Sequence, residues 1–124
     1  MKIFDSTVLI AHLRGDPAAT RLLREAVANG TAACSVLSRV EIEGGMRSGE
    51  RSSVARLFSV LDLEPVTDLV AGRAAEFLRV HRNSHPGIDV VDYVIAATAD
   101  VFGAELLTQN VKHFPMFRSL KPAF

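Results

Sequence analysis

Two aspartates lie one helical turn apart at the start of the apolar segment GIDVVDYVIAATAD, which runs from Gly87 to Asp100. This segment has the composition of a buried helix, where a carboxylate is costly unless a donor or a cation compensates for its charge. Asp89 and Asp92 therefore have two candidate roles. They could cap the helix and stabilise its positive end, or they could hold a metal ion.

Other polar residues follow the other apolar segments of the chain. Asp5 comes directly after KIF, Glu41 closes SRVE after the segment TAACSVL, and Thr108 and Asn110 follow AELL. In a parallel sheet, ligands bind outside the carboxyl ends of the strands, which share one edge. Several carboxylates at one edge repel one another and need a cation, and ligation by oxygen alone suits Mg²⁺ or Mn²⁺. Such an ion can activate water and stabilise a phosphoryl transition state.

Each of these residues also has a purely structural interpretation. Ser38 and Glu41 have the spacing of a capping box, in which Glu41 would only satisfy the backbone N–H of Ser38. Asp5 could bind the turn after its strand. His81 and His85 have a spacing that could hold Zn²⁺ on a helix, but HRNSHPG is typical of a helix end and no cysteine or third histidine is near it. The prediction of a metal site therefore rests on the joint placement of the acids.

Strands and helices are expected to alternate along the whole chain. The expected strands are KIF, TAACSVL, LDLEPV, AELLT and, weakly, SLKPA, and the proline in LDLEPV favours an edge position. Between them we expect helices that begin after Asp5, at Pro17 with Asp16 as cap, at Ser38, in VARLFSVL, at Thr67 and in the segment that ends at Gly103. This alternation predicts a central parallel sheet of four to five strands with helices on both faces, a three-layer α/β/α architecture.

The composition is that of one folded domain covering residues 1–124. Hydrophobic residues make up 48% of the chain, and its 14 basic residues balance its 14 acidic ones, so any surface for nucleic acid must be local. Cys34 is the only cysteine, which excludes an internal disulfide. No apolar run approaches the roughly 20 residues of a membrane span, and MKIFDSTVLIAHLRG is a poor signal peptide. We therefore expect a cytoplasmic protein without membrane contact.

Four segments, in this order, resemble the motifs of one family: FDSTVLIAHLRGD, SVLSRVEIEGG, DYVIAATA and LLTQNVKHF. They are similar to the motifs of PIN domains, and in particular of the VapC-type toxins of bacterial toxin–antitoxin pairs. The resemblance covers nearly the whole chain. It implies an Mg²⁺- or Mn²⁺-dependent endoribonuclease that cleaves a specific cellular RNA, forms a homodimer and is blocked by a VapB-type antitoxin.

The resemblance also implies roles for individual residues. It makes Asp5, Glu41 and Asp92 the metal-binding and catalytic carboxylates, and Thr108 a catalytic residue that positions a metal-bound water or phosphate. Asp89, Asn110 and Thr7 are possible auxiliary residues. RNA contacts are expected from arginines near the same edge, with Arg14, Arg39 and Arg47 as candidates.

The chain departs from the family pattern in two places. Ser6 and Thr7 stand in the reverse of the usual Thr-Ser order after the first aspartate. The closing motif often supplies a fourth carboxylate, but Asn110 and His113 occupy the corresponding positions here. The pattern therefore predicts one firmly bound metal ion and a second that binds weakly, unless Asp89 compensates.

Two other functions remain open at this stage. A phospho-accepting regulatory domain has a similar length and an acidic edge pocket, but it usually has adjacent acids after the first strand and a lysine after a late one. Here Asp5 stands alone and Gln109 follows Thr108. A catalytically inactive PIN-like binding module is the other alternative, and the missing fourth acid favours it. Metal-dependent cleavage of RNA by the purified protein separates these functions.

Overall fold

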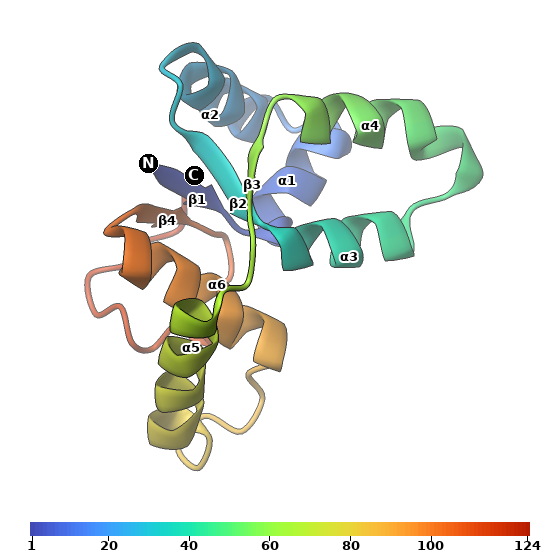
Figure 1. Cartoon of the computed structure of the whole chain (residues 1–124). Helices are drawn as coiled ribbons and strands as arrows, with labels where there is room; N and C mark the ends of the chain where they lie inside the picture. The colour runs from blue at the N-terminus through green and yellow to red at the C-terminus, as the bar shows by residue number, and fades with distance from the viewer.

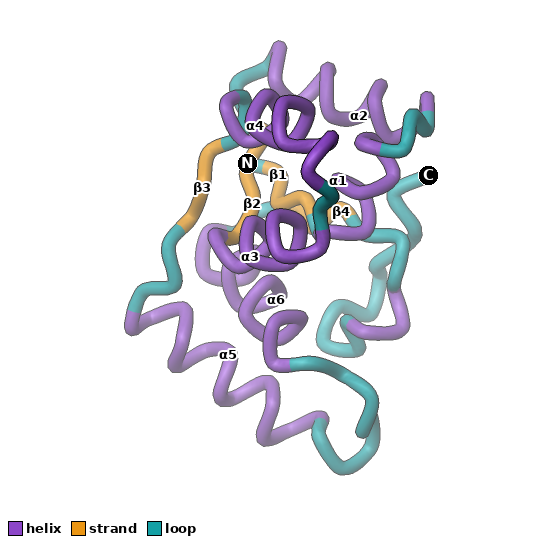
Figure 2. Tube along the Cα trace, turned by 90° about the vertical axis from the view of Figure 1, so that its right-hand side faces the viewer, coloured by secondary structure: helices purple, strands orange, loops and turns teal.

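Four parallel strands form a single sheet in the computed structural model, which describes all residues from 1 to 124. The strands are β1 (Lys2–Phe4), β2 (Ala32–Ser35), β3 (Asp62–Glu64) and β4 (Glu105–Leu107). Their order is β3-β2-β1-β4, so β3 is an edge strand, as its proline-containing segment predicts (Figure 2). The parallel pairing confirms the predicted class of sheet.

The expected fifth strand, SLKPA, does not form, and the sheet has the lower of the two predicted strand numbers. One backbone hydrogen bond, from Ala123 N–H to the carbonyl of Thr108 at 2.9 Å, joins this segment to the end of β4. Pro122 has no N–H to donate to a ladder. A short segment that contains proline therefore gains too few hydrogen bonds to pair along β4.

Six helices cover the two faces of the sheet. They are α1 (Ser6–Leu13), α2 (Pro17–Ala28), α3 (Val36–Gly45), α4 (Arg51–Ser59), α5 (Asp68–His81) and α6 (Val90–Phe102), with short 3₁₀ turns at Ser48–Glu50 and Val111–His113. Figure 1 shows α1, α2 and α4 on one side of the sheet and α5 and α6 on the other. None of the helices is both long enough and apolar enough to cross a bilayer.

The strands contribute alternate residues to two apolar cores, as the period of a strand requires. Phe4, Cys34 and Leu107 pack in the core that lies against α1, α2 and α4. Their neighbours Ile3, Ala33 and Leu106 pack in the core against α5 and α6. Because both faces of the sheet are covered, the central residues of β1, β2 and β4 are apolar, and Asp5 and Thr108 come directly after two of these strands at the carboxyl edge of the sheet.

Capping residues set the helix ends, mostly where the sequence predicts them. The side chain of Asp16 accepts hydrogen bonds from two N–H groups at the start of α2, and Thr67 caps α5 by accepting from Val70 N–H. Helix α6 ends at Gly103, whose φ of 59° lies in the left-handed region that favours glycine. The predicted starts of α2 and α5 and the predicted end of α6 are thereby confirmed.

The predicted start of α3 at Ser38 is wrong. The cap is Ser35, whose side-chain oxygen accepts from Leu37 N–H at 3.2 Å, and the helix begins at Val36. The apolar residues Val36 and Leu37 extend the strand pattern into the first turn of the helix, so hydrophobicity alone does not locate the boundary. Ser38 is buried inside α3 and its hydroxyl has no hydrogen-bond partner.

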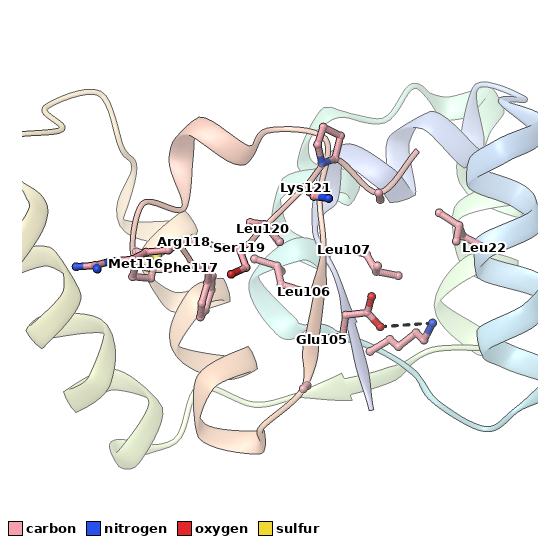
Figure 3. A pocket seen from close by; sticks show the side chains of 14 residues that line it. Leu22, Glu105, Leu106, Leu107, Met116, Phe117, Arg118, Ser119, Leu120 and Lys121 are labelled. Carbon is pink, nitrogen blue, oxygen red and sulfur yellow. Dashed lines mark ion pairs between the residues drawn. The ribbon is translucent and has the colours of Figure 1, made fainter.

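A cavity of about 670 Å³ lies beside the outer edge of β4, where the segment 116–123 passes without forming a strand (Figure 3). Leu106, Leu107 and Leu120 contribute to its lining. At its rim, Lys2 and Glu105 form an exposed ion pair at 3.5 Å. None of the residues that the sequence analysis assigns to a functional site lines this cavity.

Candidate active site

The carboxyl edge of the sheet brings together residues that are distant in the sequence. Asp5 follows β1 and takes the extended cap conformation from which α1 starts. Its backbone N–H donates to the carbonyl of Leu107 at 2.9 Å, which fixes the end of β1 against the end of β4 and hence against Thr108. Helices α3 and α6 contact each other, and Figure 2 shows them next to this edge. The predicted site residues on these elements are therefore neighbours.

Asp5 is buried, at 3% exposure, and two threonine hydroxyls hold its carboxylate. Oδ2 accepts from Thr108 Oγ1 at 2.7 Å and from Thr7 Oγ1 at 2.8 Å. Hydrogen bonds to an ionised group are the stronger ones and offset the cost of its burial. The first aspartate is thus fixed from both sides.

The same two hydroxyls also anchor the loop after β4. Thr7 Oγ1 accepts from the backbone N–H of Gln109 at 3.1 Å, and Thr108 Oγ1 accepts from that of Asn110 at 2.9 Å. A hydroxyl has a single hydrogen. Since both hydroxyls donate theirs to Asp5, their mutual contact at 3.4 Å is not a hydrogen bond. Asn110 therefore contributes to the site through its backbone.

Glu41 lies in the second turn of α3, because the helix begins at Val36, and its predicted place in the first turn is wrong. The capping-box interpretation fails with it, since Glu41 accepts a hydrogen bond from Ser6 Oγ at 2.7 Å. Desolvation raises the pKa of the Glu41 carboxyl, the bond from Ser6 opposes this, and the negative charges of Asp5 and other nearby aspartates raise the pKa further. Glu41 is exposed by surface area, so water screens these effects.

Asp92 lies in the first turn of α6, as predicted, and its side chain is 16% exposed. Oδ2 lies 2.8 Å from Nδ1 of His113, which donates because an ionised carboxylate can only accept. Burial raises the pKa of the Asp92 carboxyl, contact with His113 lowers it, and the charge of Asp5 raises it. The histidine at the position of the family's fourth acid thus touches a candidate ligand directly.

Asp89, the first of the two aspartates at the start of α6, has one of the two roles considered for this pair. It is the N-cap of α6, and its Oδ1 accepts from Val91 N–H at 3.1 Å. The capping role is therefore confirmed for Asp89. Its charge also contributes to the raised pKa of Glu41, so it lies close enough to affect the potential of the site.

The donor atoms of this edge suit a hard cation, since they are carboxylate and hydroxyl oxygens. Burial and mutual repulsion raise the pKa values of Glu41 and Asp92, and a bound cation would relieve that repulsion. However, no three His, Cys, Asp or Glu side chains stand together as a ready-made metal cluster. Glu41 is turned to Ser6 and Asp92 to His113. To share one ion, these two side chains would have to rotate.

Ser6 and His113 complete the site, although the sequence alone predicts a role for neither of them. Ser6 is marked only by its place directly after Asp5, and His113 only by its place in the closing motif. The histidines elsewhere belong to no metal cluster. His81 and His85 pack edge to face with their ring centroids 5.7 Å apart.

Comparison with known families assigns the chain to a class. The model of the PIN domain matches residues 2–115, and the chain therefore belongs to the PIN-domain family. Its relatives are ribonucleases. It is 50% identical over 124 residues to Ribonuclease VapC10 of Mycobacterium tuberculosis, covering all of this chain and 93% of the relative. It is 46% identical over 125 residues to Ribonuclease VapC19 of the same organism, covering all of both proteins.

Solved structures share the fold at lower sequence identity. A toxin–antitoxin complex from Klebsiella pneumoniae matches with a TM-score of 0.76 at 21% identity, covering 100% of this chain and 98% of that one. VapBC2 from Rickettsia felis, bound to a DNA fragment from its promoter, has the same TM-score and identity over 96% of this chain and 94% of that one. These matches support the three-layer α/β/α fold.

Proposed function

We propose that this protein is a metal-dependent endoribonuclease that acts as the toxin of a toxin–antitoxin pair. The observation that carries the proposal is its identity of 50%, over its whole length, to a protein named as a ribonuclease. The site supports it, because Asp5 and Thr108 are joined at the carboxyl edge of the sheet and charges at Asp5 and Asp92 act on Glu41. An acidic edge of this kind attracts a divalent cation, which can in turn bind the phosphate of a phosphodiester.

In this proposal Asp5, Glu41 and Asp92 hold Mg²⁺ or Mn²⁺, which would activate water and stabilise charge on the phosphate. Asp5 is the fixed ligand, since two hydroxyls orient it. Thr108 is a positioning residue, because its hydroxyl hydrogen is directed at Asp5. Glu41 and Asp92 keep one acidic oxygen each outside their hydrogen bonds to Ser6 and His113. These two side chains supply the adjustable part of the site.

The proposal includes partners. The solved relatives are described as toxin–antitoxin or VapBC complexes, which supports a VapB-type antitoxin as the partner of this chain. We further propose a homodimer acting on a specific cellular RNA in the cytoplasm. The single buried cysteine, Cys34, whose thiol pKa burial raises to about 12, is compatible with a reducing compartment.

Cleavage of RNA by the purified protein tests the enzymatic part. Total bacterial RNA is incubated with the wild type and with Asp92→Asn, in Mg²⁺, in Mn²⁺ and in EDTA. We expect discrete fragments from the wild type only, and only with a divalent ion. Folded wild-type protein that leaves RNA intact in both metals would instead support the inactive binding module.

Growth tests the toxin part separately. Expression of the wild type should stop bacterial growth, and co-expression of a cognate small partner should restore it. Asp92→Asn expressed to the same level is the matched control and should be harmless. Normal growth while folded wild type accumulates would contradict the role as a toxin, even if the enzyme cleaves RNA in vitro.

A further inference from the structure

A second cavity, of about 580 Å³, has Glu41 in its lining and is formed by α1, α3, the segment that leads into α4, and α4 itself. Its lining is half apolar, with Ile10, Leu13 and Met46 among the side chains that form it. We call this cavity the α1–α3 groove. Of the proposed metal ligands, only Glu41 is part of its lining.

Two arginines from different parts of the chain line the α1–α3 groove. Arg14 is the C-cap of α1, and Arg47 is the N-cap of the 3₁₀ turn after α3. Both side chains are exposed and neither forms an ion pair. The groove also contains Glu50, but its carboxylate accepts from the backbone N–H of Arg47 at 2.9 Å and caps that turn. Neither guanidinium group has a partner within the chain, and so both can contact an external anion.

Arg39, the third candidate of the sequence analysis, differs from these two. Its Nε lies 3.0 Å from the carboxylate of Glu43 on the same helix. Its guanidinium carbon lies 5.9 Å from the ring centroid of Phe58 on α4. It does not line the α1–α3 groove. Arg39 thus links α3 to α4, and it offers a matched control of the same residue type.

We propose that the α1–α3 groove binds the RNA strand next to the scissile phosphate, with Arg14 and Arg47 each contacting a phosphate. The inference rests on the proposed ribonuclease function and adds the path of the substrate to it. The planar guanidinium fork matches phosphate oxygens, and the aliphatic side chains of the lining can pack against the face of an unstacked base. Glu41 also lines the groove, so the two arginines share a cavity with a candidate catalytic carboxylate.

Binding of RNA as a function of salt tests this path. The probe is a fluorescein-labelled ten-nucleotide RNA of random sequence, and anisotropy is measured on the Asp92→Asn background in Mg²⁺ so that the RNA stays intact. We expect Arg14→Gln and Arg47→Gln to raise Kd about three- to ten-fold each. The double variant should also lower the steepness of log K against log salt by about 1.4, since each phosphate contact to a single strand contributes about 0.7.

The matched control is Arg39→Gln on the same background, which should leave Kd within about two-fold of the parent and the salt slope unchanged. In the active protein, Arg14→Gln/Arg47→Gln should raise KM with little change in kcat, because phosphate contacts away from the reacting atoms bind ground and transition states alike. An unchanged salt slope in the double variant would overturn the inference. So would a double variant that binds RNA normally but no longer binds the antitoxin, since the groove would then belong to that partner.

These outcomes separate the path of the RNA from the function itself. If the wild type cleaves RNA but the arginine variants bind and cleave as it does, only the path is wrong. If the wild type neither binds nor cleaves RNA, both the proposed function and the path fail. Melting temperatures of the variants should match the parent, because both arginines are exposed and unpaired.

Discussion

Asp5 and Asp92 belong to the same candidate site, but the chain holds them in different ways. Asp5 is buried between two strand ends and accepts two hydroxyl hydrogen bonds from residues 2 and 103 positions away. Asp92 sits on the first turn of a helix, is 16% exposed, and accepts from one histidine that is itself partly exposed. One carboxylate is built into the backbone framework, and the other is held by a single side chain.

This difference shows which part of the site is fixed in advance. The threonines that hold Asp5 are in turn bonded to backbone N–H groups of the loop after β4, so their rotamers are locked. Asp92 and Glu41 can rotate at the cost of one part-buried hydrogen bond each. Because hydrogen bonds to charged groups contribute about 1.5–3 kcal/mol, a cation turns both side chains toward it where its binding offsets that loss.

The largest expected effect is on cleavage. Asp5→Asn and Asp92→Asn should each reduce the rate of RNA cleavage by at least about a hundredfold, since losing a metal ligand removes several kcal/mol of transition-state stabilisation. Both variants should fold, and without metal their melting temperatures should equal or exceed the wild-type value because repulsion between carboxylates falls. Asp62→Asn, an exposed aspartate on β3, is the control. Wild-type cleavage by Asp92→Asn would refute its assignment as a ligand.

The second prediction compares the hydroxyl groups on the two sides of the site. Thr108→Val should lower the free energy of unfolding by about 1–3 kcal/mol, because a buried carboxylate loses a donor and Asn110 N–H loses its acceptor. Ser6→Ala should cost less, since the carboxylate of Glu41 can turn to water. Urea denaturation measures both, and Thr108→Ser, which keeps the hydroxyl, should restore most of the loss. Equal losses of stability in Thr108→Val and Ser6→Ala would mean that the chain holds Glu41 as firmly as Asp5.

The third prediction concerns pH and applies to the protein in EDTA. Glu41 and Asp92 have pKa values raised above their ordinary values near 4. Between those ordinary values and the raised ones, the folded state binds more protons than the unfolded state, so stability falls as pH rises through this window. Denaturation in EDTA from about pH 4 to 7 should show this decline. Glu41→Gln/Asp92→Asn should flatten it, and a saturating divalent ion should offset it, since ligation requires deprotonated carboxylates.

An equally steep decline in Glu41→Gln/Asp92→Asn would assign the effect to other groups. The exposed Asp62→Asn variant again serves as the control and should keep the wild-type profile. The effect of the Glu41 change alone should be the smaller of the two, because that side chain is exposed and screened by water.

The order of strands and helices could be predicted from the sequence because single residues mark the helix ends. Asp16-Pro17, Thr67 and Gly103 mark helix ends through their own backbone and side-chain chemistry. The start of α3 could not be read in this way. Its apolar first turn continues the pattern of β2, and only the hydrogen bond from Leu37 N–H to Ser35 marks the change.

The candidate site likewise has features that the sequence predicts and contacts that it does not. Its position was predictable, because parallel strands end at one edge and Asp5 and Thr108 follow two of them. The contacts between side chains were not. Nothing local in the sequence indicates that Ser6 reaches Glu41 across 35 positions, or that His113 reaches Asp92 across 21. Such pairs depend on how α1, α3 and α6 pack, and a single sequence does not encode that packing in any short pattern.

The smallest expected effect separates the two aspartates of α6. Asp89→Ala should lower the free energy of unfolding by about 1 kcal/mol, because the N–H of Val91 loses its cap. Asp89→Ser keeps a capping oxygen without the charge, so it should keep most of the stability and change cleavage less than about two-fold. Urea denaturation and RNA cleavage are measured on the same preparations. A loss of cleavage in Asp89→Ser as large as in Asp92→Asn would make Asp89 a metal ligand as well as a cap, because a serine cap preserves the helix start but cannot replace a carboxylate at a divalent ion.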